Sequence, residues 1–220
     1  MSARARWIRL GLVEPLELRA AYTGLAEAQP RRAAPILLWA QAKFDTLIGL
    51  ARAEEHHYVL ALIVPRHLAP GRRARWRAWA LAPVIAAYRQ FGLRAYQRGE
   101  EIWLDGRRIA QSGAGAIGEC VVAASSLLDA FPAPRGDAGR AARAGEFRAW
   151  LREGTALARS EWTGRGEPPA QRQLEAVLRG RFEAQHGWQF ETSWPTAAER
   201  AAIRGARAAL AGQRAEAIAS

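Results

Sequence analysis

Runs of apolar residues along the first part of the chain predict several short strands. The alternation of polar and apolar residues in Arg6–Leu12 is typical of a strand with one buried face. The continuous apolar run Tyr58–Val64 (YVLALIV) is the most convincing strand of the chain, and Ala34–Ala40 and Thr46–Leu50 predict shorter buried strands. These segments together predict an N-terminal sheet.

Two helices are predicted beside these strands. The first covers Glu14–Glu27 and has proline in its first turn, where the missing N–H costs no hydrogen bond. The second covers Pro70–Gln90 and ends at Gly92, because glycine readily adopts the positive φ that closes a helix. Since Pro83 lies inside the second helix, we expect a kink or break near Ala82.

A β-hairpin is the clearest local signal in the chain. Glu101–Leu104 and Arg107–Ala110 are short strands joined by Asp105-Gly106, and both turn residues tolerate the positive φ of a two-residue hairpin turn. The next segment, Ser112–Gly118, contains three glycines and is expected to be flexible. Glu119–Ala124 predicts a further strand after it.

The C-terminal third is predicted to be mainly helical. Thr196 precedes Glu199 by three residues, which is the spacing of a helix capping box. The loop-like segment Pro132–Gly145 marks a boundary, so we predict a domain over 1–132 and a helical subdomain over 146–220 packed on it. The predicted fold class is α/β (α+β), a mixed sheet with covering helices. The C-terminal elements expected are helices over Glu146–Arg159, Pro169–His186 with a stop at Gly187, and about Ala197–Ala215, and a short strand over Trp188–Glu191.

Length and composition narrow the class of protein. A chain of 220 residues that is 50% hydrophobic is long enough for a sizeable core. No apolar run reaches the roughly 18–20 residues of a membrane-spanning helix, so we expect no membrane association. The single cysteine, Cys120, excludes an internal disulfide and indicates a cytoplasmic location.

The net charge of +11 comes almost entirely from arginine, because only Lys43 among the 32 basic residues is lysine. The densest basic run, Arg72–Arg77, includes Trp76 and would suit a nucleic-acid backbone and a stacked base. The same pattern fits a helix with a solvated arginine face and tryptophans turned to the core. We favour the second interpretation, which disfavours nucleic acid as a partner.

Three other groups contain residue types that are used in metal binding, catalysis or nucleotide binding, but their positions in the sequence do not suit those roles. The cluster Glu54–His57 offers metal-ligand side chains, yet neighbouring residues of a strand point to opposite faces, so we predict no metal site. Cys120 would need a lowered pKa to act as a nucleophile, and its apolar neighbours favour a structural role. Gly113, Gly115 and Gly118 have the spacing of a dinucleotide motif but lead into a strand instead of a helix.

The hairpin carries a family resemblance. Gly99–Ser112 (GEEIWLDGRRIAQS) resembles the central signature of the lipoate–protein ligase, octanoyltransferase and biotin–protein ligase superfamily, which is approximately N-D-I-x-x-x-G-x-K-I-x-G-S. The resemblance implies a ligase or class II synthetase-like fold. The flanking segments resemble those of the family in the same order: Ala34–Trp39, Asp45–Gly49, Leu60–Pro65, Pro83–Gly92, Ala123–Asp129, Gln173–Gly187 and Thr196–Glu199.

The resemblance also implies site residues, several of which depart from the family pattern. Arg108 stands at the position of the family lysine, which bridges the acyl carboxylate and the α-phosphate of the acyl-adenylate. Glu100 and Glu101 replace the Asn-Asp pair, and Ala123 replaces a histidine. The glycine-rich loop expected before Tyr58 is missing from this sequence. Ligand-binding positions implied by the resemblance are Gly106, Ile109, Gln111 and Ser112.

Three functions follow as hypotheses. The first is a divergent lipoate- or octanoate-protein ligase or acyltransferase that would use ATP with lipoate or octanoate and act on an acidic lipoyl-type carrier domain. The second is a non-catalytic ligase-like scaffold or carrier binder that has lost adenylation. The third is a basic nucleic-acid-binding protein built around Arg72–Arg77. Since arginine's planar fork cannot replace a compact ammonium without rearrangement, Arg108 indicates lost or altered catalysis.

Overall fold

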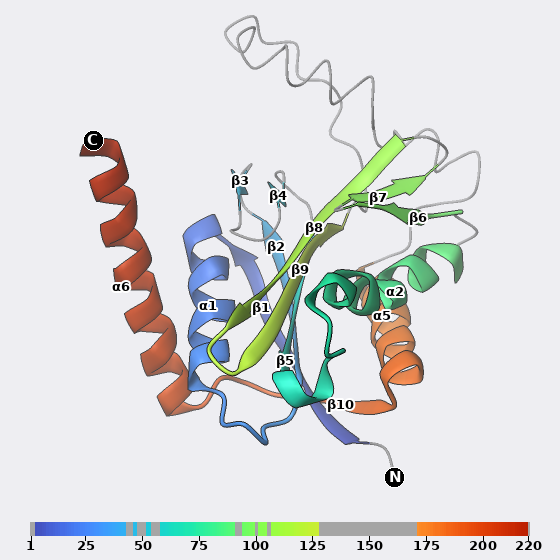
Figure 1. Ribbon diagram of the computed structural model, residues 1–220, viewed down its shortest axis with the longest axis horizontal. Coiled ribbons are helices and arrows are strands. Elements are labelled where there is room, and N and C mark those ends of the chain that lie inside the picture. The colour runs from blue at the N-terminus through green and yellow to red at the C-terminus, as the bar shows by residue number, and fades with distance from the viewer. Residues whose placement is uncertain are drawn as a thin grey trace, which may run out of the picture.

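A computed structural model describes residues 3–42, 46–47, 52–53, 58–90, 94–99, 101–104, 107–127 and 171–219, and every structural statement below refers to these residues (Figure 1). The predicted loop Pro132–Gly145, the helix Glu146–Arg159, the hairpin turn, Gly92 and the cluster Glu54–His57 lie outside them. The strands are β1 (Ala3–Val13), β2 (Ile36–Ala42), β3 (Thr46–Leu47), β4 (Arg52–Ala53), β5 (Tyr58–Pro65), β6 (Tyr96–Arg98), β7 (Glu101–Leu104), β8 (Arg107–Ile117), β9 (Cys120–Leu127) and β10 (Trp188–Thr192).

The described strands form a mixed eight-stranded sheet in the order β10-β1-β2-β5-β9-β8-β7-β6. The pairs β10–β1 and β1–β2 are parallel, and the other pairs are antiparallel. The short strands β3 and β4 pair separately. The predicted mixed sheet with covering helices is confirmed.

α1 (Pro15–Ala28) and α5 (Gln171–His186) begin and end close to where the sequence predicts, whereas the helix predicted over Pro70–Gln90 starts only at Trp76, after a 3₁₀ turn over Arg73–Arg75. α1 has proline in its first turn, and α5 ends before Gly187, whose φ is 68°. α6 (Ala197–Ala219) is longer than predicted. α2 (Trp76–Gln90) continues through Pro83, so the helix is not broken near Ala82, and the other predicted outcome, a kink there, stays a prediction. Pro83 is buried, and packing of its helix against the core outweighs the missing hydrogen bond.

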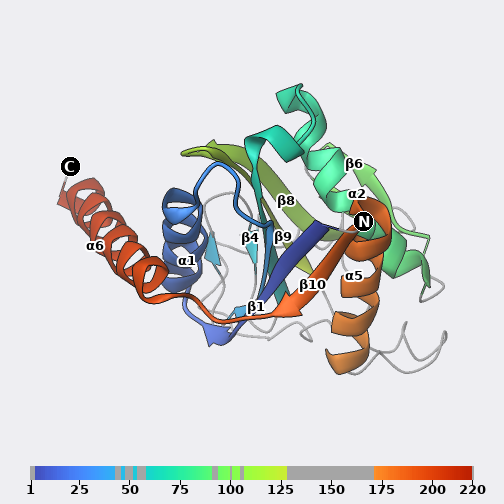
Figure 2. The ribbon, with the colours of Figure 1, turned by 90° about the horizontal axis from the view of Figure 1, so that it is seen from below.

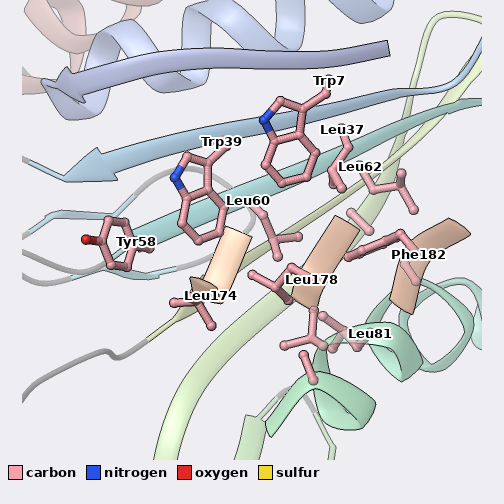
Figure 3. Close-up of a cluster of buried hydrophobic side chains, with 14 of the residues drawn as sticks. Trp7, Leu37, Trp39, Tyr58, Leu60, Leu62, Leu81, Leu174, Leu178 and Phe182 are labelled. Atoms are coloured by element: carbon pink, nitrogen blue, oxygen red, sulfur yellow. The ribbon is translucent and has the colours of Figure 1, made fainter. Parts of the chain in front are cut away.

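Two helical layers cover the sheet (Figure 2). α1 packs on one face with α6 outside it, while α2 and α5 cover the opposite face. All eight residues of β5 are buried, because this central strand meets a helical layer on each side. Figure 3 shows the core under α5, where Leu174, Leu178 and Phe182 meet side chains of the sheet.

The segment predicted to be flexible belongs instead to β8. Ser112 to Ile117 pair in register with β9, including Gly113 opposite Ala124 and Gly115 opposite Val122. The ladder hydrogen bonds and burial outweigh the conformational freedom of these glycines. Gly118 lies in the turn between β8 and β9 and has a φ of 53°, a value that glycine adopts without strain.

The C-terminal elements share the sheet and the cores of the N-terminal part. β10 pairs with β1, and α5 and α6 contribute to the two helical layers. Arg6 of β1 donates to Ser193 Oγ at 3.0 Å and forms an ion pair with Glu199, which also completes the predicted capping box with Thr196. The division into 1–132 and 146–220 stays a prediction.

These contacts lower the pKa of the Glu199 carboxyl group. Burial raises the pKa of its carboxyl group, but the hydrogen bonds from Arg6 and Thr196 and the Arg6 charge lower that pKa below its ordinary value. The start of α6 is thereby tied to β1 by a charged, hydrogen-bonded contact.

The basic run Arg72–Arg77 agrees in part with the interpretation that we favoured: its tryptophan faces the core, but Arg72, Arg73 and Arg75 precede α2 instead of lying on a helix face. Arg72, Arg73 and Arg75 are exposed, whereas Trp76 is buried and donates its indole N–H to the carbonyl oxygen of Pro70 at 2.6 Å. Trp76 is therefore not available to stack on a base. Among the described residues, no helix has the length and apolarity to cross a membrane.

His186 lies in an aromatic cluster at the end of α5. Its ring centroid is 4.5 Å from that of Trp79, 4.4 Å from Trp188 and 5.8 Å from Phe182. Its Nε2 is buried without a hydrogen-bond partner among the described residues. Burial lowers the pKa of His186 to about 4, so the imidazole is neutral near pH 7.

This cluster predicts a pH dependence of stability. In the unfolded chain the imidazole of His186 binds a proton below its ordinary pKa of 6.5, whereas in the folded chain it stays neutral down to about pH 4. The free energy of unfolding should therefore fall as the pH drops through that interval. The variant His186→Phe should lack this contribution to the pH dependence of the free energy of unfolding, which urea titrations at pH 7, 6 and 5 measure. Equal slopes for the two proteins would contradict the assignment.

Close packing of α1 on α6 gives a second prediction. A Cβ added at Gly24 would lie 2.5 Å from the backbone nitrogen of Ile203 and 2.6 Å from its Cα. Gly24→Ala should therefore lower the free energy of unfolding by about 1–3 kcal/mol in urea titrations. Gly205→Ala is the control: its added Cβ meets nothing within 4 Å, so helix propensity should raise stability by about 0.5–1 kcal/mol.

Candidate functional site

The hairpin register brings three predicted site residues to one face of the outer sheet. Arg108 pairs with Trp103, and Gln111 pairs with Glu101. The register shifts between these pairs, so that Ile102 lies opposite Ala110 and Ile109 has no partner on β7. Residues directly opposite one another share a face, which groups the positions of Arg108, Glu101 and Gln111.

Glu101 is held by its neighbours on this face. The indole N–H of Trp103 donates to Glu101 Oε2 at 3.0 Å, and the Arg98 guanidinium lies 5.3 Å from the centre of the Trp103 ring. Tyr96, opposite Trp103, is 40% exposed. A fixed carboxylate, two aromatic rings and a cation therefore border the Arg108 position.

The predicted ligand-binding residue Ser112 lies on the opposite face of β8. Ile102 and Ala110 belong to the core under α2 and α5, and Ser112 follows Ala110 by two residues on the same face. Ser112 is 1% exposed and pairs with the equally buried Ser125. The structure thus separates Ser112 from the group around Arg108.

Ser112 instead ends a row of residues that crosses the sheet beneath α5. Strand register places Ser125 beside Leu60, Leu60 beside Trp39, and Trp39 beside Arg9. The row contains polar atoms within an otherwise apolar face. Sequence reasoning missed it, because only the pairing of strands that are far apart in the chain creates it.

Trp39 is the unexpected member of this row. It is 2% exposed, and its indole Nε1 has no hydrogen-bond partner among the described residues. Its ring stacks on Trp7 with 6.1 Å between centroids and on Tyr58 with 4.9 Å. In Figure 3 the indole nitrogen of Trp39 and the hydroxyl of Tyr58 point toward the same end of the sheet. The indole N–H of Trp39 is therefore a buried donor that the described residues leave without an acceptor.

A charged pair closes the outer end of the row. Arg9 forms an ion pair with Glu175 of α5, and the Glu175 side chain is 4% exposed. A carboxylate so buried requires its cationic partner, so this contact anchors α5 over the row.

The remaining predicted positions are described only in part. Glu100 and Gly106 lie outside the described residues, and for Arg108, Ile109 and Gln111 the structure describes the backbone alone. β4 packs against β8 and β9, between β2 and β5 in the chain, where the sequence has a short segment in place of the glycine-rich loop. Within the described residues, no group of three His, Cys, Asp or Glu could hold a metal ion.

Comparison of the sequence and the structure with those of known proteins identifies the fold. The sequence matches no protein-family model and no curated protein. The structure is similar to an archaeal bi-partite lipoate protein ligase from Thermoplasma acidophilum, with 11% identity, a TM-score of 0.72, and coverage of 93% of this chain and 92% of that one. This chain has the lipoate/biotin protein ligase fold.

Two further structures agree with this assignment. A lipoate-protein ligase A bound with ATP is 10% identical, with a TM-score of 0.68 over 93% of this chain and 94% of that chain. A biotin protein ligase from Leishmania major, in complex with biotinyl-5-AMP, is 11% identical, with a TM-score of 0.54 over 84% of this chain and 76% of that chain. The ligase fold therefore extends over nearly the whole chain.

Cys120 does not supply a nucleophile to this ligase fold. It is 1% exposed on the α1 face of β9. Burial raises the pKa of the Cys120 thiol to about 11, with a further increase from the Glu119 charge and a partial offset from Arg66. The thiol is therefore protonated near neutral pH, in agreement with the structural role favoured from sequence.

The buried thiol gives a direct prediction. At pH 8 the native protein should react with Ellman's reagent at least about 100 times more slowly than the protein unfolded in guanidinium chloride, because thiolate and access are both lacking. Cys120→Ala should leave any acyl transfer within about twofold of wild type. Rapid native labelling, or loss of transfer in a folded Cys120→Ala variant, would assign the thiol a chemical role.

Proposed function

We propose that this protein is a divergent lipoate- or octanoate-protein ligase-like protein that acts on, or binds, a lipoyl-type carrier domain. The observation that carries the proposal is the match of nearly the whole chain to the Thermoplasma acidophilum ligase, whose structure was studied with its E2 lipoyl domain. The similarity to an ATP-bound lipoate-protein ligase supports ATP as a substrate.

The residues around the hairpin fit the chemistry of such a reaction. ATP, as a substrate, would convert the acyl carboxylate into an acyl-adenylate and release pyrophosphate. A lysine amine of the carrier would then attack the acyl carbonyl carbon, lose a proton and displace AMP, which leaves an amide. Arg108 would bind the carboxylate and the adjacent phosphate, since a guanidinium forms paired hydrogen bonds with either anion. Gly106, Ile109 and Gln111 stay the proposed ligand-binding positions around Arg108, whereas Ser112 is buried on the opposite face of β8 and is not part of this group.

Glu101 would orient the acceptor amine, together with Glu100. A carboxylate attracts and aligns an approaching ammonium, and the Trp103 N–H already restricts the Glu101 side chain. This restriction reduces the entropy lost when the acceptor binds. Trp103 is thus proposed as a positioning residue for Glu101.

The basic surface supports an acidic carrier as the acceptor. A net charge of +11 attracts acidic proteins and accelerates their encounter. Nucleic acid is the weaker proposal, because the tryptophan of the basic run is buried. We further propose that the protein acts in the cytoplasm.

A reconstituted acylation assay tests the proposal. Purified protein, ATP, lipoate or octanoate, and an unmodified lipoyl domain should yield acylated lipoyl domain by mass spectrometry. Arg108→Ala should lower kcat/KM by about 100-fold or more, as expected for loss of a charged group at the reacting centre. The neighbouring Arg107→Ala is the matched control and should stay within about threefold.

The outcomes separate the two ligase-like hypotheses. Saturable binding of the lipoyl domain without acylation, and without calorimetric binding of ATP or the acyl acid, would replace the ligase by the non-catalytic carrier binder. Failure to bind ATP, acyl acid and lipoyl domain alike would reject both. Equal losses in the Arg107 and Arg108 variants would remove the specific role of Arg108.

A further inference from the structure

A groove lies between α2 and α5, on the face of the sheet opposite to the Arg108 position. It has a volume of about 620 Å³ and is lined by residues of both helices and by Gln97 of β6. Its α2 side is a stripe of small residues, Ala78, Ala82 and Ala86, which repeat every four positions. Figure 2 shows these helices on the side of the sheet opposite to α1 and α6.

Two arginines border one end of this groove in fixed orientations. Arg89 donates from Nε to the carbonyl oxygen of Ala95 at 3.0 Å, and Arg181 donates from Nε to Gln90 Oε1 at 2.8 Å. Among the described residues, neither guanidinium has an acidic partner, and neither donates from its terminal nitrogens. These planar, pre-oriented groups therefore keep their paired donors for an anion.

The glutamines that line the groove suit a peptide backbone as a ligand. Gln90, Gln97 and Gln185 place amide groups around the apolar stripe, and none of the described residues that line the groove is acidic. Amides both donate and accept hydrogen bonds, as a peptide backbone does. The positive charge gathers at the end formed by Arg89 and Arg181.

The dimensions favour a short peptide. From Ala78 to Gln90 the helix rises about 18 Å, at roughly 1.5 Å per residue. An extended peptide of about five residues at 3.3 Å each spans that length. A single-stranded nucleic acid would need exposed aromatic rings for stacking, but Trp188 is buried and Trp79 packs against the core.

We propose that the α2–α5 groove binds an acidic peptide segment of a partner protein. Arg89 and Arg181 pair with its carboxylates, small side chains of the segment rest on the alanine stripe, and the glutamines bind its backbone. This site is separate from the Arg108 hairpin and does not depend on acyl transfer.

Fluorescence anisotropy with a defined probe tests the groove. The probe is a fluorescein-labelled peptide of alternating glutamate and alanine, with the glutamine–alanine peptide as its neutral counterpart. The wild-type protein should bind the acidic probe saturably and at least about tenfold more tightly than the neutral one. Binding should weaken with added salt, because the groove is open to solvent.

Matched charge variants locate the binding. The double variant with Arg89→Gln and Arg181→Gln should bind the acidic probe at least about tenfold more weakly than the wild type does. Arg19→Gln with Arg204→Gln removes the same charge from exposed positions of α1 and α6 and should change affinity by less than about twofold. Ala86→Glu, which leaves both arginine hydrogen bonds in place, should also weaken binding, and circular dichroism checks that every variant is folded.

Several results would overturn the proposal. These are the absence of saturable probe binding, equal losses in the groove and control variants, and unchanged binding after the groove substitutions. Stronger, groove-dependent binding of a single-stranded oligonucleotide or of inorganic phosphate would assign the site to a different anion and would equally reject the peptide.

Discussion

The structure depends on burying both faces of the central strands. β5 has no exposed residue, so each of its faces needs a helical cover. α1 supplies one cover, and α2 with α5 supplies the other. Because α5 lies far from the first strands in sequence, the segment after residue 170 is required to complete the fold. The layered shape, the groove and the row beneath α5 all follow from this requirement.

The fold was predictable wherever a local pattern agreed with the final packing. The apolar run of β5, the stop at Gly187 and the capping box of Thr196 and Glu199 each have short-range causes. Local rules failed at Pro83 and at the glycines of β8. In both places tertiary packing or strand pairing overrides an unfavourable local preference.

The candidate site was predictable only in part. The hairpin was found because its turn and strands are contiguous, and its register groups the positions of Arg108, Glu101 and Gln111. The separation of Ser112 from them, and the unpaired indole N–H of Trp39, depend on pairings between distant strands. The α2–α5 groove likewise arises from two segments whose sequences give no sign of their contact.

The parallel pairing of β1 with β10 affects how the chain reaches its native state. Ala3 lies opposite Trp188, so this pair closes a loop that contains nearly all of the described chain. Loops of that length close slowly and at an entropic cost, so hairpins and neighbouring strands should assemble earlier. On the ribosome, β1 would emerge long before its β10 partner and meanwhile keep one strand edge open. The sheet would gain β10 only after Trp188–Thr192 had been made, so β1 has to stay soluble with that edge unpaired until then.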